Sequence, residues 1–343
     1  MLVALVTAGV LAAVPSGGLP DVKAIGAVAE VRDGGHVWRG SSGVAELGTS
    51  RPVPVAGRFR AGSITKTFVA TVVLQLVGEG RMRLDDPVER WLPGVVPNGE
   101  NITVRQLLNH TSGLYDYKNT LAMPPNAEFY TYQFRTWTAA EQIQRALAHP
   151  PVFDKPGSQF NYSNTNYLLL GEIIEKVTGQ TYGEQVERRL IRPLGLHGTT
   201  MPGTSTYIRG AHLHGYVPKD GGLVDFTEMN PSLFGAGGEL ISTTRDLNRF
   251  FAALLGGRLL PALLLAEMKT PGTEGGTYGL GLSWHDTSCK VRVYGNDGDA
   301  LAYQAYSYAT EDTRRQVTVA VTPDFRTNPD ASVDAFVDRA ICR

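Results

Sequence analysis

The stretch RFRAGSITKTFVATVVLQLV, residues 58–77, carries the strongest structural signal in this chain. Ser63 stands three positions before Lys66, and apolar residues then repeat at helical spacing as far as Gly78. Residues three apart lie side by side on one helical turn. The pair is therefore either a nucleophile with its base, or a helix cap followed by a solvated lysine.

The setting of this pair favours the chemical interpretation. Because the run that follows is apolar on all sides, we expect Lys66 to be pressed toward a buried face. Desolvation disfavours the ammonium form and leaves a neutral amine able to accept the proton of Ser63. Gly62 allows another backbone segment to approach closely. The start of the helix would stabilise negative charge that develops on a substrate oxygen.

Strand patterns occur near both ends of the chain, and helical patterns lie between them. Asp33-Gly34-Gly35 predicts a hairpin within residues 26–40. Further strands are predicted over 291–294, 301–309 and 316–321. Helices are predicted over 102–110, 138–149 and 165–178, from Thr243, and from Asn328-Pro329, read as a cap followed by proline at the first helical position.

This order indicates an α/β sheet lobe that is interrupted by an all-α lobe. We expect residues 1–60 and 226–343 to form the discontinuous sheet lobe, and residues 61–225 to form the helical lobe. Active sites commonly lie in the cleft between such lobes. Ser63 stands where the chain passes from one lobe to the other.

Composition and termini restrict the partners and the compartment. The formal net charge is −1, without a basic block, so neither nucleic acid nor an anionic membrane is an expected partner. No apolar run is long enough for a transmembrane segment. We expect a monomer that binds a small molecule or short peptide. The opening stretch, residues 1–18, has the length of a signal-peptide core but no preceding Lys or Arg, which favours a domain helix over a signal peptide.

The two cysteines allow two interpretations. Cys289 precedes a strand-like segment, and Cys342 is the penultimate residue. They are either two buried thiols or a disulfide that fixes the last helix to the sheet, with a loop-closure contribution of roughly 4 kcal/mol. Their positions favour the disulfide, which would imply an oxidising, extracytoplasmic compartment. Free thiols would instead indicate the cytoplasm.

A second polar group follows about a hundred residues after Ser63, in the sequence FNYSNTNY, residues 160–167. Tyr162 and Asn164 present a phenol and an amide two residues apart, just before a helix. They either face the same cleft as Ser63 or belong to a helix-capping turn.

Several motifs taken together resemble the serine DD-peptidase and class C β-lactamase superfamily, especially its secreted actinobacterial DD-carboxypeptidase/transpeptidases. The resemblance runs from about residue 26 to the end and includes both cysteine positions. It implies a β-lactamase/transpeptidase-like fold, an antiparallel sheet flanked by helices with an inserted helical lobe. The motifs are RFRAGSITKTF, LDDPVERWLPG, ITVRQLLNHTSGLYDY, YSNTNYLLLGEIIEKVTG, PLGL, STTRDL and YGLGL.

The resemblance also implies a role for each matching residue. Ser63 would be the acylated nucleophile and Lys66 its base. Tyr162 would pass the proton to the leaving group, and Asn164 would bind the substrate amide. The backbone N–H groups of Ser63 and Asp299, the latter on the edge strand of the sheet, would form the oxyanion hole. No cofactor is implied.

The third motif of the superfamily, Lys-Thr-Gly or His-Thr-Gly, is missing. Asn296, Asp297, Gly298 and Asp299 occupy its place in the predicted substrate-binding segment, and Ser283 stands where the DD-peptidase has an arginine after GLGL. A site for a terminal carboxylate needs positive charge and bidentate donors. We therefore expect substrates that carry a carboxylate to bind poorly, unless both aspartates lie on a loop that is turned outward into solvent.

These observations predict a serine acyl-enzyme hydrolase or acyltransferase, acting on an amide or ester without a free terminal carboxylate. The alternatives are a D-alanyl-D-alanine carboxypeptidase/transpeptidase and a catalytically weak, penicillin-binding-like sensor. His212 and His214 could offer two metal ligands from a strand, but no third ligand has recognisable spacing, so we expect no metal. No glycine-rich phosphate loop follows any predicted strand.

Overall fold

The computed structural model of the chain describes residue 19 and residues 22–342. The domain helix or signal peptide considered for residues 1–18 lies outside the described residues. Within these limits no helix is long and apolar enough to cross a membrane.

A six-stranded antiparallel sheet organises the molecule, as the resemblance implied. The hairpin at Asp33-Gly34-Gly35 is confirmed, and its first strand pairs with the last strand of the chain over the register Gly26↔Thr322 to Asp33↔Arg315. The sheet therefore joins the two ends of the described chain. Its order is β2 (His36–Gly43), β1 (Gly26–Asp33), β10 (Arg315–Thr322), β9 (Gln304–Thr310), β8 (Arg292–Asp299) and β7 (Ser283–Asp286).

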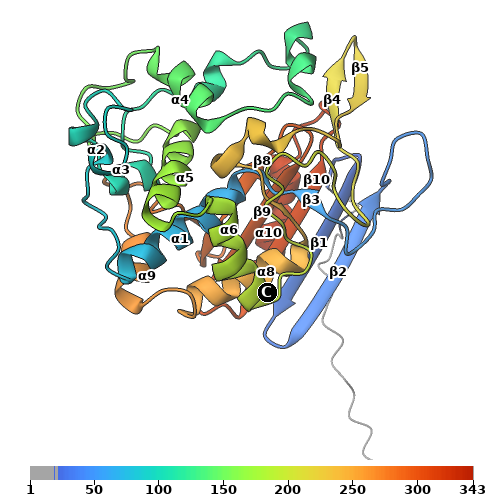
Figure 1. Ribbon diagram of the computed structural model, residues 1–343. Helices are drawn as coiled ribbons and strands as arrows, with labels where there is room; N and C mark the ends of the chain where they lie inside the picture. The colour runs from blue at the N-terminus through green and yellow to red at the C-terminus, as the bar shows by residue number, and fades with distance from the viewer. Residues whose placement is uncertain (1–18, 20–21, 343) are drawn as a thin grey trace, which may run out of the picture.

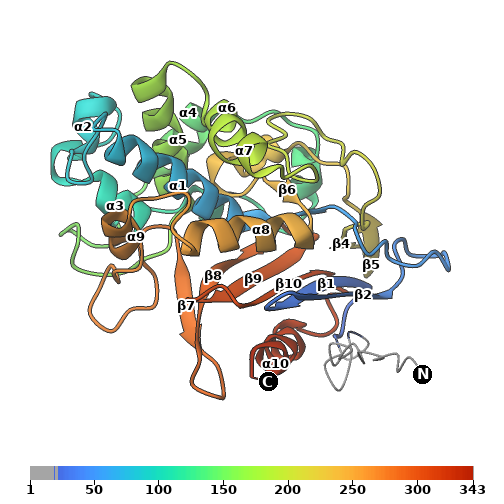
Figure 2. The same ribbon diagram turned by 90° about the horizontal axis from the view of Figure 1, so that it is seen from below.

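Helices cover both faces of the sheet (Figure 2). The amphipathic helix α8 (Thr244–Leu255) packs against one face, and α10 (Asp330–Ile341) packs against the other through buried Val333, Phe336 and Val337. The predicted start of α10 is wrong by one residue. The helix begins at Asp330, and Pro329 is its N-cap residue. The predicted capping by Asn328 is confirmed, because the Asn328 side chain accepts a hydrogen bond from the Asp330 amide N–H at 2.9 Å.

The remaining helices gather on the α8 side of the sheet, around α1 (Figures 1 and 2). Helix α1 (Thr65–Gly78) is buried on nearly every side and packs against α5 (Asn164–Thr178), which ends at the predicted Gly179. The others are α2 (Val88–Trp91), α3 (Val104–Leu108), α4 (Ala139–Leu147), α6 (Tyr182–Val186), α7 (Arg192–Leu194) and α9 (Ala262–Met268). Two small ribbons, β3 (Phe59–Arg60) with β6 (Ile241–Ser242) and β4 (Tyr216–Lys219) with β5 (Gly222–Asp225), lie outside the main sheet.

The expectation that residues 296–299 belong to the edge strand needs correction. On this side of the sheet the edge strand is β7, which the sequence analysis did not predict, and β8 is the next strand inward. However, β7 is short and pairs only with residues 292–295 of β8. The end of β8 runs past its neighbour and lies against the turn that carries Ser63. Residues 296–299 are therefore accessible because β7 is too short to pair with them, although β8 is not an edge strand.

Cys289 and Cys342 are joined by a disulfide, with their Cα atoms 5.7 Å apart. The bond ties the connection between β7 and β8 to the end of α10. The structure therefore bears out the disulfide that the cysteine positions favoured.

Candidate active site

Ser63 lies in a single 3₁₀ turn, Gly62–Ile64, that leads into α1. The helix-cap alternative is wrong, because the N-cap of α1 is Ile64 and no side chain caps this end. Instead, Ser63 Oγ accepts hydrogen bonds from Lys66 Nζ at 3.1 Å and from the Tyr162 hydroxyl at 2.8 Å. The serine hydroxyl is therefore committed to two groups that can move a proton.

Lys66 is fully buried, as its apolar surroundings in the sequence predicted. Its Nζ also donates to Asn164 Oδ1 at 2.8 Å and to the Gly237 carbonyl at 2.6 Å. Desolvation lowers the pKa of Lys66 to about 7, although the carboxylate of Asp116 partly opposes this by stabilising the ammonium form. Near neutral pH, Lys66 is therefore a free amine in a large fraction of the molecules.

Tyr162 and Asn164 reach the same point from the start of α5. Asn164 Nδ2 donates to Asp116 Oδ2 at 2.8 Å, which turns Asn164 Oδ1 toward Lys66. Desolvation, followed by the neighbouring Tyr278, raises the pKa of Tyr162 well above its usual value. Tyr162 is therefore a protonated phenol at neutral pH and can donate its proton.

Two glycines allow the end of β8 to contact the turn that carries Ser63. A Cβ on Gly298 would lie 2.0 Å from the Ala61 carbonyl oxygen and 2.8 Å from the Ser63 amide nitrogen. Gly62 has a φ of +53°, and a Cβ there would lie within 2.6–2.7 Å of the Asp299 backbone. Residues 62–63 and 298–299 consequently lie close together, and the oxyanion hole expected from the N–H groups of Ser63 and Asp299 stays a prediction.

A cavity of about 340 Å³ opens above Ser63. Asp297 and Asp299 are exposed to solvent, yet both line this cavity, so they do not lie on a loop turned away from it. Partial desolvation by the cavity walls raises the pKa of Asp297; a hydrogen bond from the backbone N–H of Asp297 opposes this, and the carboxylate of Asp330 adds to it. The lining residues are Ser63, Tyr117, Lys118, Tyr162, Asn164, Phe234, Gly237, Gly238, Tyr278, Ser283, Asn296, Asp297 and Asp299.

Sequence reasoning missed several parts of this site. Asp116, Lys118 and His110 lie in or beside the motif ITVRQLLNHTSGLYDY, so a signal existed, but no role was assigned to them. The carbonyl of Gly237 carries no side-chain signal. Asn296 was expected to bind substrate; it lines the cavity but is almost fully buried, and its Nδ2 donates to Thr67 Oγ1 at 3.2 Å.

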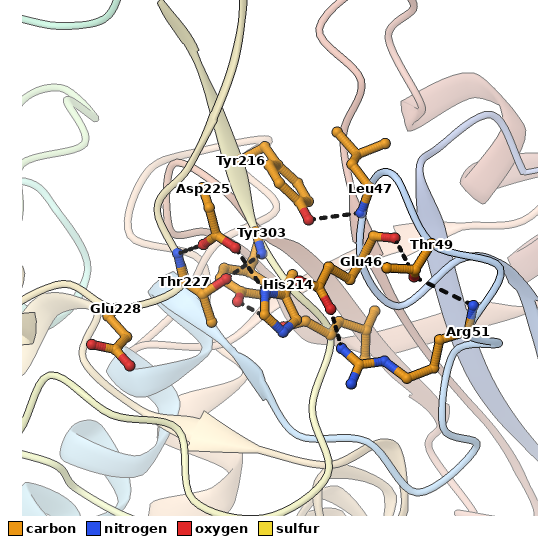
Figure 3. A network of polar contacts seen from close by, with 12 residues as sticks. Glu46, Leu47, Thr49, Arg51, His214, Tyr216, Asp225, Thr227, Glu228 and Tyr303 are labelled. Atoms are coloured by element: carbon orange, nitrogen blue, oxygen red, sulfur yellow. Dashed lines mark hydrogen bonds and ion pairs between the residues drawn. The ribbon is translucent and has the colours of Figure 1, made fainter.

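His212 and His214 do not lie on a strand, because β4 begins only at Tyr216. Their rings stack with centroids 5.2 Å apart. His214 Nδ1 also lies 2.7 Å from Asp225 Oδ2, a contact that Figure 3 shows. Among the residues that the structure describes, no group of three or more His, Cys, Asp or Glu side chains is placed to hold a metal ion. The arrangement fits a histidine–carboxylate pair near the surface.

Comparison with known proteins places these features in context. The family model described as Beta-lactamase matches residues 19–342. The solved D-stereospecific amidohydrolase from Streptomyces sp. is 42% identical, with a TM-score of 0.84 over 91% of this chain and 93% of that chain. The D-amino acid amidase from Ochrobactrum anthropi SV3, solved with L-phenylalanine amide, is 29% identical, with a TM-score of 0.81 over 93% of each chain.

Among curated relatives, penicillin-binding protein 4* of Bacillus subtilis is 30% identical over 246 residues, which cover 67% of this chain and 52% of the relative. The chain thus spans about half the length of this relative. In contrast, this chain covers 93% of each of the two solved structures named in the previous paragraph.

Proposed function

The chain belongs to the beta-lactamase family, and from this premise we propose that it is a serine acyl-enzyme hydrolase acting on amides or esters without a free terminal carboxylate. The observation that carries the proposal is the position of Ser63 Oγ, which lies 3.1 Å from the amine of Lys66 and 2.8 Å from the hydroxyl of Tyr162. Ser63 and Tyr162 line the cavity, and the buried Lys66 contacts Ser63 from within the protein. They supply a nucleophile, a base and an acid within hydrogen-bond reach.

The proposed reaction has two halves. Lys66 takes the proton of Ser63 while Oγ forms a bond to the substrate carbonyl carbon, and the N–H groups of Ser63 and Asp299 stabilise the oxyanion. The bond to the leaving nitrogen or oxygen then breaks as Tyr162 gives it a proton, and the ammonium of Lys66 reprotonates Tyr162. Asn164 holds Lys66 in place and offers its amide to the substrate. Water, or an amine in the transfer reaction, then releases the acyl group from Ser63.

The walls of the cavity support a substrate without a carboxylate. Asp297 and Asp299 lie on the β8 side, and Ser283 contributes no positive charge. Of the two solved relatives described above, one is named a D-stereospecific amidohydrolase and the other a D-amino acid amidase. We therefore propose amides or esters of D-amino acids as the substrate class.

One observation favours the alternative of a D-alanyl-D-alanine carboxypeptidase. Lys118 lines the same cavity from the helical side and could attract a carboxylate. However, its neighbour Asp116 carries the opposite charge, and its side chain accepts the Lys118 backbone N–H at 3.0 Å. The similarity of this chain to penicillin-binding protein 4* also supports the carboxypeptidase alternative.

The location of the site supports the proposed division into a sheet lobe, residues 1–60 and 226–343, and a helical lobe, residues 61–225. Ser63, Tyr162 and Asn164 come from the second part, and Asp297 and Asp299 come from the first. We also propose an extracytoplasmic location, because a disulfide between Cys289 and Cys342 persists in oxidising compartments. A monomer remains our expectation for the assembly.

The decisive experiment is intact-mass analysis after incubation with a fluorophosphonate, with penicillin, and with a D-amino acid p-nitrophenyl ester. We expect one covalent adduct at Ser63 with the fluorophosphonate, little adduct with penicillin, and multiple turnover of the ester. Ser63→Ala should abolish both the adduct and the turnover while the fold is retained. Labelling that survives in Ser63→Ala would refute the mechanism. A single stoichiometric acylation without turnover would support the sensor alternative.

A further inference from the structure

We infer that His110, which has no assigned role in the reaction, is the positioning residue that holds Tyr162 over Ser63. This inference rests on the proposed function, since it assigns Tyr162 as the proton donor to the leaving group. The inference itself comes from three separate contacts between His110 and the chain around Tyr162.

The first two contacts hold the backbone on either side of Tyr162. The His110 carbonyl accepts the amide N–H of Asn161 at 2.8 Å, and the His110 ring accepts the amide N–H of Ser163 through Nδ1 at 3.2 Å. One residue therefore binds the amides immediately before and after Tyr162. This pairing fixes the backbone from which the phenol projects.

The third contact is between the rings. The centroids of His110 and Tyr162 lie 4.2 Å apart, with an angle of 32° between the ring planes. The histidine ring is fully buried, so it forms a rigid surface against which the tyrosine ring rests. The hydroxyl at the far end of the tyrosine ring then lies 2.8 Å from Ser63 Oγ.

The protonation state of His110 is set by its neighbours. A backbone N–H can only donate, so Nδ1 must carry a lone pair, and Asn166 Nδ2 lies 3.2 Å from the same atom. Asn166 is held in this orientation because its Oδ1 accepts the hydroxyl of Ser112 at 2.7 Å. Burial, followed by the charge of Lys66, lowers the pKa of His110 well below its usual value. The ring is therefore neutral over the working pH range.

The backbone of His110 indicates that this side chain serves a specific purpose. It has a φ of +59°, in the left-handed region, two residues after α3 ends at Leu108. Glycine is the usual residue at such a position, and other residues there carry strain. Glycine would relieve the strain but would lose the Nδ1 acceptor and the ring. The strained histidine is explained by the two contacts that only its side chain provides.

Two variants separate the positioning role from simple folding. His110→Asn keeps an acceptor near the Nδ1 position and tolerates a positive φ, whereas His110→Gly keeps only the backbone. Amides need a proton on the leaving nitrogen, but p-nitrophenolate leaves without one. We therefore expect His110→Gly to slow hydrolysis of a D-amino acid p-nitroanilide by ~10–100-fold through kcat, the range for partial loss of a general acid, and to slow the p-nitrophenyl ester by under about threefold. His110→Asn should recover most of the lost anilide activity.

A double-mutant cycle with Tyr162→Phe completes the test. If His110 acts through the phenol, His110→Gly should cost little in the Tyr162→Phe background. Equal losses in both backgrounds, or equal losses on anilide and ester, overturn the inference. If His110→Gly does not fold, the test uses His110→Asn alone. A loss of anilide hydrolysis in His110→Asn as large as the loss in Tyr162→Phe would then overturn the inference. Absence of fluorophosphonate labelling at Ser63 in the unmodified protein would instead refute the proposed function, and the inference with it.

Discussion

The clearest prediction concerns pH, because the proposed base is a lysine whose pKa the fold has lowered to about 7. An unperturbed lysine, with a pKa of about 10.4, is a free amine in only about one molecule in 2,500 at pH 7. At a pKa of about 7, roughly half of the molecules carry the free amine. Burial of Lys66 thus raises the concentration of competent base by about a thousandfold.

The sign of the effect follows from the protonation states. Below its pKa, Lys66 is an ammonium ion and cannot accept the proton of Ser63, so acylation should fall tenfold per pH unit. Above it, the rate should level off and stay level, because the pKa of Tyr162 is raised well above its usual value and the phenol keeps its proton. We expect the kcat/KM of a neutral ester to show one acid limb with an apparent pKa near 7.

The assay needs a control, because Glu239 also titrates in this range. Glu239 is almost fully buried beside Gly238, and desolvation raises its pKa to about 7. Glu239→Gln keeps the shape and removes the titration, so the acid limb should persist in this variant. A limb that disappears in Glu239→Gln, or one that lies near pH 10 in the unmodified protein, would refute the assignment of Lys66 as the base.

Three further predictions follow from charges and covalent bonds in the same region. Asp297→Asn should improve the kcat/KM of substrates with a free carboxylate, relative to their amides, by one to two powers of ten. A like charge about 4 Å away costs about 4 kcal/mol at an effective dielectric of 20, before discounting for exposure. Equal kcat/KM for acid and amide in the unmodified protein would contradict this prediction. Asp116→Asn should move the acid limb to lower pH, since Asp116 raises the pKa of Lys66, and a pH profile that does not move would count against that coupling. Alkylation under non-reducing denaturation should find no free thiol, whereas two free thiols at Cys289 and Cys342 would exclude the disulfide.

Local patterns in the sequence predicted the parts of the fold that depend on neighbouring residues. The hairpin at Asp33-Gly34-Gly35 and the end of α5 at Gly179 are confirmed, because turn and cap chemistry is decided within a few residues. The contact between Ser63 and Lys66 follows from helical spacing in the same way. Strand β7, only four residues long, has no such local signal and was not predicted.

The candidate site was only partly predictable, because half of it depends on contacts between distant segments. Tyr162 contacts Ser63 although 99 positions separate them in the chain. The sequence alone left this contact open beside a helix-capping turn, and the resemblance to a known superfamily favoured it. Asp116 acts by orienting Asn164, and Gly237 contributes a backbone carbonyl. Neither contribution can be read from residue type or spacing, since each exists only after the chain has folded.

These distant contacts determine how the nucleophile is activated. As an ammonium ion, Lys66 has three N–H donors, and the structure gives it three acceptors: Asn164 Oδ1, the Gly237 carbonyl and Ser63 Oγ. A neutral amine has two N–H donors and one lone pair. Asn164 Oδ1, whose Nδ2 is already bound to Asp116, and the Gly237 carbonyl can only accept, so they retain the two donors. The lone pair must then face Ser63, whose hydroxyl reverses its hydrogen bond and points its proton at the base. Loss of one proton from Lys66 therefore both creates the base and orients the nucleophile toward it.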